Sequence, residues 1–498
     1  MLRLIFMKVK VIMCWLNRRD LKKKIKFLIA FLIPVAAVMV MNNGLDNDSW
    51  YMLAEGREIV NNGIYYEDQL SIHEGLNVTV QNYGFAVIFY LLYSVFGGVG
   101  VYIAMLVVNG VLCYLIYKIC MLISNKNTNL SLILMILTDL LLAYCFVVTR
   151  AQVVSYVIFM SIIYFLELYA RKGDRRVLWW IPVLSFLQIN LHASLWPMIL
   201  IVLIVYMIDG VKQPRLKYKG YKIKPLIIIL LASFGVGFLN PYGLKMITFI
   251  LTSYGIPEAN DYINEMQPFR TFASNYDILL YGAIVAVLIS YIFGKNKNIR
   301  IRYLLMMFGF LALGLNTFKG MSQVILVLLF PMAEVYKNVR IVKWRRVGRI
   351  AAMWTGVLAI MTVGTYLVVV VPDTNNDTPG EVMAKGIDAM DLAVGEINKN
   401  DLRVYADYNM GGYVEYRGYK AYIDPRMEVF IKSNNGKEEI FKEYYDLQHR
   451  EVDKKEFISK YNFDYGDEYD LIFKEDESED DSDGVKVYKK KEQDYIKI

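Results

Sequence analysis

Two carboxylates separated by one residue are the clearest candidates for chemistry in this sequence. Asp46 and Asp48 stand in the segment LDNDSWYMLAEGR, directly after a long apolar run. A carboxylate in such a place can take a proton from a hydroxyl group, and two together can hold a divalent cation. A structural role competes with this, because Asp48 is a suitable N-cap for a helix that starts at Ser49 and ends at Asn62-Gly63. Taken alone, the pattern favours the cap.

Further polar residues follow in the same loop. Glu67 and Asp68 would supply additional acids to the same site, and Gln81 and Asn82 would hydrogen-bond a sugar. The alternative is that all four are ordinary loop and helix-start residues, and the sequence favours this alternative.

Isolated cations lie near the ends of later apolar runs. Arg150 stands between two such runs, and Lys319 is alone at the edge of another. Cations at a membrane edge are costly and often functional, and a guanidinium matches phosphate oxygens in a bidentate fork. For Arg150, an anchor that reaches the interface remains an equal alternative. Glu265, in a loop expected on the same side, would face the same cavity.

His192 is the remaining polar candidate. It lies between two short apolar runs with Asn190 nearby, and it has no His, Cys or acid at a spacing that suits a metal. Packing against a neighbouring helix is therefore favoured over catalysis. The sequence contains neither a Walker loop nor a dinucleotide-binding glycine motif, so nothing indicates that ATP drives the protein. Its four cysteines form no disulfide or zinc pattern.

The elements that must position these residues are membrane helices. Hydrophobic residues make up 56% of the chain and charged residues 21%. Each bilayer span needs about 20 mostly apolar residues, and the long apolar runs continue to residue 371. This composition excludes a soluble single-core enzyme. The apolar runs are 27–41, 84–97, 100–121, 130–148, 151–170, 178–190, 193–209, 225–240, 277–294, 302–316, 319–336 and 350–371.

Charge is distributed unequally along the chain. Residues 373–498 hold 31 acidic and 19 basic residues, whereas the remainder holds 36 basic and 17 acidic. The basic residues gather in short loops between apolar runs, which is the positive-inside pattern and not a nucleic-acid surface. We therefore expect a multi-pass protein of the cell membrane with a cytoplasmic N-terminus and an extracytoplasmic C-terminal domain. The basic loops are 171–176, 212–224, 295–302 and 337–349.

Because the N-terminus and the C-terminal domain are expected on opposite sides of the membrane, the chain must cross it an odd number of times. We expect about eleven transmembrane helices, within a range of ten to thirteen. The run 84–97 is the weakest crossing, because it is short and precedes Gly-Gly-Val-Gly. Two alternatives would give an odd number: this run is re-entrant, or one of the short runs 178–190 and 193–209 does not cross fully. The first run has no small-residue cleavage site, so we expect a retained helix and not a signal peptide.

The chain thus divides into a basic cytoplasmic N-terminus (1–26), a membrane domain (27–372) with a polar outer loop (42–83), and an external domain (373–498). The external domain alternates helical and strand patterns and predicts a small α/β fold. Its expected elements are a helix over Pro379–Asn398, a short helical segment at Gly411-Gly412, and strands at Arg403–Tyr405, Lys420–Ile423, 470–473 and 485–489.

The order of these motifs resembles a known superfamily. The membrane-embedded glycosyltransferases of the C-type fold include protein O-mannosyltransferases, aminoarabinose transferases and oligosaccharyltransferase catalytic subunits. The chain resembles a bacterial, uncharacterised branch of that superfamily. It departs from the branch with Ala151 in place of Pro, Lys319 in place of Arg, and Gln81-Asn82-Tyr83 in place of a Trp-containing motif. The residues that carry the resemblance are Asp46, Asp48, Trp50, Gly56-Arg57, Arg150-Ala151-Gln152, Asn190-Leu191-His192, Asn240-Pro241-Tyr242-Gly243, Glu265, Lys319, Tyr405-Ala406-Asp407-Tyr408, Gly411-Gly412-Tyr413 and Ile423-Asp424-Pro425-Arg426.

The resemblance implies transfer of a sugar from a polyprenyl-phosphate donor to a glycan, lipid or protein acceptor at the outer leaflet. Asp46 or Asp48 would be the base, and Arg150 and Lys319 would bind the phosphate. A divalent cation, if used, would bind Asp46 and Asp48. Two alternatives stay open: a transporter or scaffold for glycan lipids, and a member of the fold that binds such lipids without transfer. The further candidates for substrate contact are Glu265, His192, Gln81 and Asn82.

Overall fold

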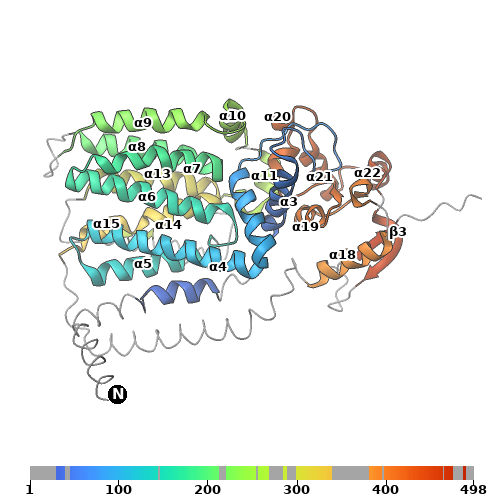
Figure 1. Ribbon diagram of the computed structural model, residues 1–498, viewed down its shortest axis with the longest axis horizontal. Coiled ribbons are helices and arrows are strands. Elements are labelled where there is room, and N and C mark those ends of the chain that lie inside the picture. Colours follow the sequence, from blue (N-terminus) through green and yellow to red (C-terminus); the bar gives the residue numbers. More distant parts are fainter. Residues whose placement is uncertain are drawn as a thin grey trace, which may run out of the picture.

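The fold is taken from a computed structural model, which shows a bundle of long helices with a mixed helical and sheet unit at one end (Figure 1). We call the end of the bundle that carries this unit the cavity end, because the cavity of the candidate site lies there. The structure describes residues 28, 30–39, 45–143, 146–211, 220–253, 256–268, 284–285, 287–288, 299–338, 381–394, 398–463, 465–474 and 486–489.

Within these residues, four helical stretches are long and apolar enough to cross a membrane, namely Tyr83–Ile123, Ala151–Lys172, Ala193–Gly210 and Phe318–Val335. Shorter apolar helices lie beside them. The expected run 350–371 and most of the run 277–294 lie outside the described residues, so the number of crossings stays a prediction. The bundle helices are α4 (Tyr83–Ile123), α5 (Thr128–Ala143), α6 (Ala151–Lys172), α7 (Trp180–Leu191), α8 (Trp196–Gly210), α9 (Lys224–Gly235), α13 (Ile301–Asn316), α14 (Met321–Leu328) and α15 (Phe330–Val335).

The weak run 84–97 is the first part of α4. The helix breaks at Gly97, whose φ of 63° and ψ of −169° are far from helical values, and continues without a loop to Ile123. Glycine accepts this positive φ at no steric cost. The run is therefore a bent extension of the following span, and nothing in its geometry makes it a separate crossing.

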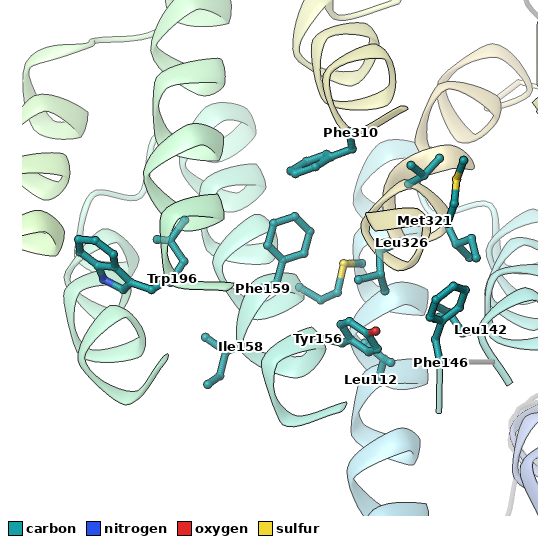
Figure 2. Close-up of a cluster of buried hydrophobic side chains, with 14 of the residues drawn as sticks. Leu112, Leu142, Phe146, Tyr156, Ile158, Phe159, Trp196, Phe310, Met321 and Leu326 are labelled. Atoms are coloured by element: carbon teal, nitrogen blue, oxygen red, sulfur yellow. The ribbon is translucent and has the colours of Figure 1, made fainter. Parts of the chain in front are cut away.

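Apolar side chains from several helices fill the middle of the bundle. Figure 2 shows Tyr156 and Phe159 of α6 lying near Phe310 of α13 and Leu326 of α14. Tyr156 is 1% exposed and Leu326 is 1% exposed, so this region is fully packed. Close packing of this kind fixes the ends of α6 and α14 relative to one another.

A charged network is buried at the far end of the bundle from the cavity end. Arg302 of α13 donates to Glu167 of α6 at 2.7 Å and to Asp209 of α8 at 2.7 Å, and all three are at most 1% exposed. Arg171 extends the network by joining Glu167 to Glu334 of α15. Every charge has an opposite partner, which indicates a structural clamp between four helices.

The C-terminal segment contains the elements expected from its sequence. Its four-stranded sheet has the order β2-β1-β3-β4, in which β1 is parallel to β2 and β3, and β3 is antiparallel to β4. The strands are β1 (Arg403–Val404), β2 (Lys420–Ala421), β3 (Tyr465–Lys474) and β4 (Lys486–Lys489). The helices are α18 (Glu381–Val394), α19 (Gly411–Tyr416), α20 (Lys432–Asn435), α21 (Ile440–Gln448) and α22 (Lys454–Tyr461).

The polar loop after the first apolar run packs onto this unit. It forms α3 (Asn47–Asn62), whose Trp50 lies 4.8 Å from the Tyr413 ring of α19. Beyond α3 the loop runs beside β2, where Ile72 N–H donates to the carbonyl of Ala421 at 2.9 Å. Segments 350 residues apart in sequence therefore make one structure at the cavity end. Short helices from the middle of the chain complete it: α10 (Leu244–Thr252), α11 (Pro257–Tyr262), and the 3-10 turns η2 (Ala193–Leu195), η4 (Asn264–Met266) and η6 (Phe318–Gly320). The C-terminal segment adds the 3-10 turn η9 (Met427–Phe430).

Candidate active site

The start of α3 assigns different roles to the two aspartates. Asp46 is the N-cap: its carboxylate accepts from Ser49 N–H at 3.0 Å and from the Ser49 hydroxyl at 2.7 Å. The expectation that Asp48 caps a helix starting at Ser49 is therefore wrong, and the helix begins two residues earlier. The reason is reciprocal capping, since Ser49 at the third helical position also accepts from Asp46 N–H. The expected end at Gly63 is correct.

Arg150 joins the two aspartates to a third acid. Its guanidinium pairs with Asp46 through Nε, and its Nη1 lies 2.9 Å from Asp48 and 2.8 Å from Glu265. Arg150 is the N-cap residue of α6, and the hydroxyl of the preceding Thr149 lies 2.8 Å from the Ser49 hydroxyl. Thr149 is the donor of this contact, because the single hydrogen of the Ser49 hydroxyl goes to Asp46. The starts of α3 and α6 are thus bound side by side, which fixes the arginine against the acids.

Glu265 and Lys319 come from two 3-10 turns that are bound to each other. The backbone N–H of Phe318 in η6 donates to the carbonyl of Gln267, next to η4, at 2.9 Å. This contact places Lys319 Nζ 4.0 Å from Glu265. The Lys319 side chain keeps 42% of its surface exposed, so its ammonium group is accessible to a ligand.

These groups surround one cavity of about 240 Å³. Asp48, Arg150, Glu265, Lys319 and Gln81 all line it, so the structure brings together five of the ten candidate residues that the sequence singled out. The C-terminal segment closes the opposite wall. Tyr408, from the segment Tyr405-Ala406-Asp407-Tyr408 that carries the resemblance, also lines the cavity. The wall residues that the sequence did not single out include Tyr51, Ser194, Tyr262, Asn409 and Glu428.

The cavity perturbs its acids in opposite directions. Burial raises the pKa of Asp48 to about 7, with further upward contributions from Asp46 and Glu265, against the opposing effect of Arg150. Burial also disfavours the charged form of Glu265, but Arg150 and then Lys319 outweigh it and lower the pKa of Glu265. Asp48 is thus able to exchange a proton near neutral pH while Glu265 stays ionised.

Gln81 has a role of its own, which Asn82 does not share. The Gln81 amide donates to Glu428 of η9, and its backbone carbonyl accepts from Ala193 N–H at 2.9 Å. Asn82 is the N-cap residue of α4 and is not among the cavity-lining residues. For Asn82 the helix-start alternative is therefore the one that the structure supports.

His192 also lies outside the cavity wall. It ends α7, it is 9% exposed, and its two ring nitrogens contact the hydroxyls of Ser155 and Ser194, each at 2.8 Å. Ser194 does line the cavity. Packing between helices is thus what the structure shows for His192, with one hydroxyl between it and the cavity.

Asp68, one of the two additional acids expected from the sequence, belongs to a separate cluster around Arg426. Asp68 lies 2.8 Å from Arg426, which also pairs with Asp424 at 2.7 Å and with Glu415 at 3.4 Å. Glu55 of α3 completes the cluster at 3.8 Å from the same guanidinium. Four buried carboxylates share one arginine, and burial raises the pKa of Glu55 to about 8. This cluster binds the loop of α3 to the C-terminal unit, and Glu67 lies on the exposed side of that loop.

A divalent cation does not fit Asp46 and Asp48 in this arrangement. Both carboxylates already pair with the Arg150 guanidinium. Across the residues that the structure describes, no three His, Cys, Asp or Glu side chains are grouped so that they could hold a metal.

Some wall residues had a signal in the sequence. Tyr51 stands three residues after Asp48, so both lie on one face of α3. Ser194 follows His192 by two residues, and Glu428 follows the Asp424-Pro425-Arg426 segment that was interpreted as turn chemistry. Tyr408 and Glu428 reach the cavity wall because the C-terminal segment packs on the end of the bundle, and no local sequence pattern predicts that packing.

Comparison with known proteins agrees with this geometry at the level of fold. No family model matches the chain, and no curated protein matches it. Among solved structures, it is similar to the Archaeoglobus fulgidus oligosaccharyltransferase tethered to an acceptor peptide containing the NVT sequon. The TM-score is 0.54 at 11% identity, over 88% of this chain and 68% of that one. The chain therefore shares the fold of this oligosaccharyltransferase.

Proposed function

We propose that this protein is a glycosyltransferase that moves a sugar from a polyprenyl-phosphate donor to a glycan, lipid or protein acceptor at the outer leaflet of the cell membrane. The observation that carries the proposal is one cavity that holds a carboxylate able to take a proton, Asp48, beside an accessible cation, Lys319. The shared fold supports it, because the similar solved structure is a sugar-transferring enzyme by its name.

In the proposed reaction, the Asp48 carboxylate takes the proton of an acceptor hydroxyl as that oxygen forms a bond to the anomeric carbon. The bond between the anomeric carbon and the phosphate oxygen breaks, and its electron pair stays on the phosphate. Lys319 stabilises the negative charge that develops there. Arg150 is held by three carboxylates and keeps Asp48 in place, so Lys319 is the better placed of the two predicted phosphate partners.

The proposed orientation follows from the same arrangement. The loop with α3 and the C-terminal segment form one structure, so they lie on one side of the membrane. Positive-inside loops place the opposite end of the bundle in the cytoplasm. The cavity would then face outward, where a lipid-linked sugar presents its headgroup.

The test is turnover of polyprenyl-phosphate sugars by purified protein in lipid nanodiscs. We expect wild type to transfer or hydrolyse at least one donor, and Asp48→Asn to lose this activity while keeping its thermal melt. Asp261→Asn is the matched control, because Asp261 is an exposed acid of α11 outside the cavity wall. If no donor is turned over, while sealed liposomes with wild type move a lipid-linked sugar between leaflets, the transporter alternative replaces this proposal.

A further inference from the structure

A chain of hydrogen bonds runs from the cavity wall into the bundle. Ser194 Oγ contacts His192 Nε2 at 2.8 Å, and His192 Nδ1 contacts Ser155 Oγ at 2.8 Å. Gln188 Nε2 then contacts Ser155 Oγ at 2.9 Å. Ser194 lines the cavity, whereas Ser155, Gln188 and His192 are buried. The chain therefore connects a half-buried hydroxyl at the cavity wall to three buried residues.

The inner end of this chain fixes its direction. Gln188 Nε2 also lies 2.5 Å from the carbonyl of His192, which can only accept, so the amide nitrogen and not its oxygen is at this position. The amide therefore donates to Ser155 Oγ. Ser155 has one hydrogen of its own, with His192 Nδ1 at 2.8 Å and the Ala151 carbonyl at 3.4 Å. The shorter contact directs that hydrogen to Nδ1.

It follows that His192 carries its hydrogen on Nε2 and donates it to Ser194. A protonated imidazole gives the same result at this nitrogen, because both ring nitrogens then donate. In either state Ser194 Oγ accepts from His192, and its own hydrogen is directed away from the ring. The hydroxyl thus faces the cavity as a donor.

The backbone holds Ser194 in this position. His192 leaves the helical conformation with φ −164° and ψ 89°, which separates α7 from the turn η2. Ala193 N–H then donates to the carbonyl of Gln81 at 2.9 Å. Gln81, Ser194 and Lys319 all line the same cavity, so the oriented hydroxyl of Ser194 and the accessible ammonium group of Lys319 face one space.

We propose that Ser194 is a substrate-binding residue that donates a hydrogen bond to an anionic oxygen of the donor phosphate, with His192, Ser155 and Gln188 as positioning residues. A hydroxyl fixed as a donor beside an ammonium group suits a ligand that only accepts, and a phosphate is such a ligand. This inference rests on the proposed function, because it names the group that the same cavity recognises.

The experiment measures binding of a polyprenyl phosphate, and of the uncharged polyprenol of equal length, to purified protein in nanodiscs. We expect Ser194→Ala to weaken binding of the phosphate about ten-fold or more, as befits a lost hydrogen bond to a charged group, and to leave the polyprenol unchanged. Ser194→Thr keeps the hydroxyl and should retain most of the affinity. Ser155→Ala should weaken phosphate binding in the same direction by less.

Ser161→Ala is the matched control, since Ser161 is on the same helix as Ser155 and its hydroxyl bonds its own helix at Val157. If Ser194→Ala binds the phosphate as wild type does, the inference is overturned. If it weakens binding of the phosphate and of the polyprenol equally, Ser194 is structural and the inference also fails.

The failure of this inference can be told from the failure of the proposed function. If Asp48→Asn loses turnover and Ser194→Ala has no effect on phosphate binding, the function is retained and the role of Ser194 is rejected. If phosphate binding depends on Ser194 but no donor is turned over, the role of Ser194 is retained and the proposed function is rejected.

Discussion

At the scale of single residues, the two aspartates of the sequence pattern have separate tasks. Asp46 is committed to the cap of α3 and to Arg150, while Asp48 faces the cavity. The D-x-D spacing predicted a cap and a reactive acid but assigned the cap to the wrong residue. It did so because the cap depends on Ser49 at the third helical position, and two adjacent starts of α3 are compatible with the same local sequence.

Asp48 sets the expected pH dependence of transfer. Because burial raises its pKa to about 7, the carboxylate that accepts the proton is formed as pH rises through 7. We predict that kcat/KM increases with pH to a plateau, with an apparent pKa near 7. Arg150 lowers the pKa of Asp48, so Arg150→Gln should move the midpoint upward. A pH profile that is flat from pH 5 to pH 9 in both proteins would exclude Asp48 as the base.

Arg150 also determines the expected metal dependence. Its guanidinium occupies the carboxylates that would otherwise bind a cation. We predict that EDTA leaves the transfer rate unchanged and that added Mg²⁺ or Mn²⁺ does not increase it. Rates measured after dialysis against EDTA check this, and a rate lost with EDTA and restored by one of these ions would contradict it.

At the scale of elements, local sequence patterns predicted the secondary structure more completely than they predicted the site. The helices and strands expected between Pro379 and residue 489 overlap α18, α19 and β1 to β4, with bounds that differ by up to five residues. Their signals are short-range periodicity and turn residues. The packing of α3 on α19 and the run of the loop beside β2 depend on contacts between distant segments, such as Trp50 with Tyr413, which periodicity cannot show. The same limit concealed the place of Glu428 in the cavity wall and the pairing of Asp68 with Arg426.

The Arg426 cluster makes this interface sensitive to pH. The folded pKa of Glu55, about 8, lies above its ordinary value, so the folded state binds the extra proton between about pH 4.5 and 8 and loses stability as pH rises through that window. Glu55→Gln cannot ionise. We predict that its melting temperature relative to wild type increases from pH 5.5 to pH 8.5, by a few degrees in all. Melts in nanodiscs at several pH values check this, with Glu58→Gln, on the exposed end of α3, as control.

At the scale of the whole molecule, polar groups concentrate at the two ends of the bundle and serve different purposes. The far-end network around Arg302 has three acids and three cations, because Lys337 also pairs with Glu334 at 2.7 Å. The cavity wall has three acids, Asp48, Glu265 and Glu428, and two cations, Arg150 and Lys319. Buried charges that are fully paired are costly to separate, whereas charges that are incompletely paired remain available to a ligand. This division explains why the cavity, and not the more buried network, is the proposed site.

The far-end network should therefore affect stability without affecting the site. Arg302→Met removes the arginine that pairs with both buried Glu167 and buried Asp209, while Arg171 still pairs with Glu167. Removing one partner of a buried ion pair costs about 3–5 kcal/mol in comparable cases. We predict a large fall in melting temperature, together with an unchanged KM for the donor in the folded fraction. Lys222→Met, at an exposed lysine, is the control. A changed KM at unchanged stability would show that the network acts on the cavity.

The most direct test of the central claim compares Asp48→Asn with Asp46→Asn in the same transfer assay. Asparagine is as good an N-cap as aspartate, so Asp46→Asn should keep α3 and retain substantial activity. Asp48→Asn removes the proton acceptor and should lower kcat by about 100-fold or more at an unchanged melting temperature. If the Asp48→Asn protein is folded and transfers sugar at the wild-type rate, Asp48 is not the base and the proposed mechanism is wrong.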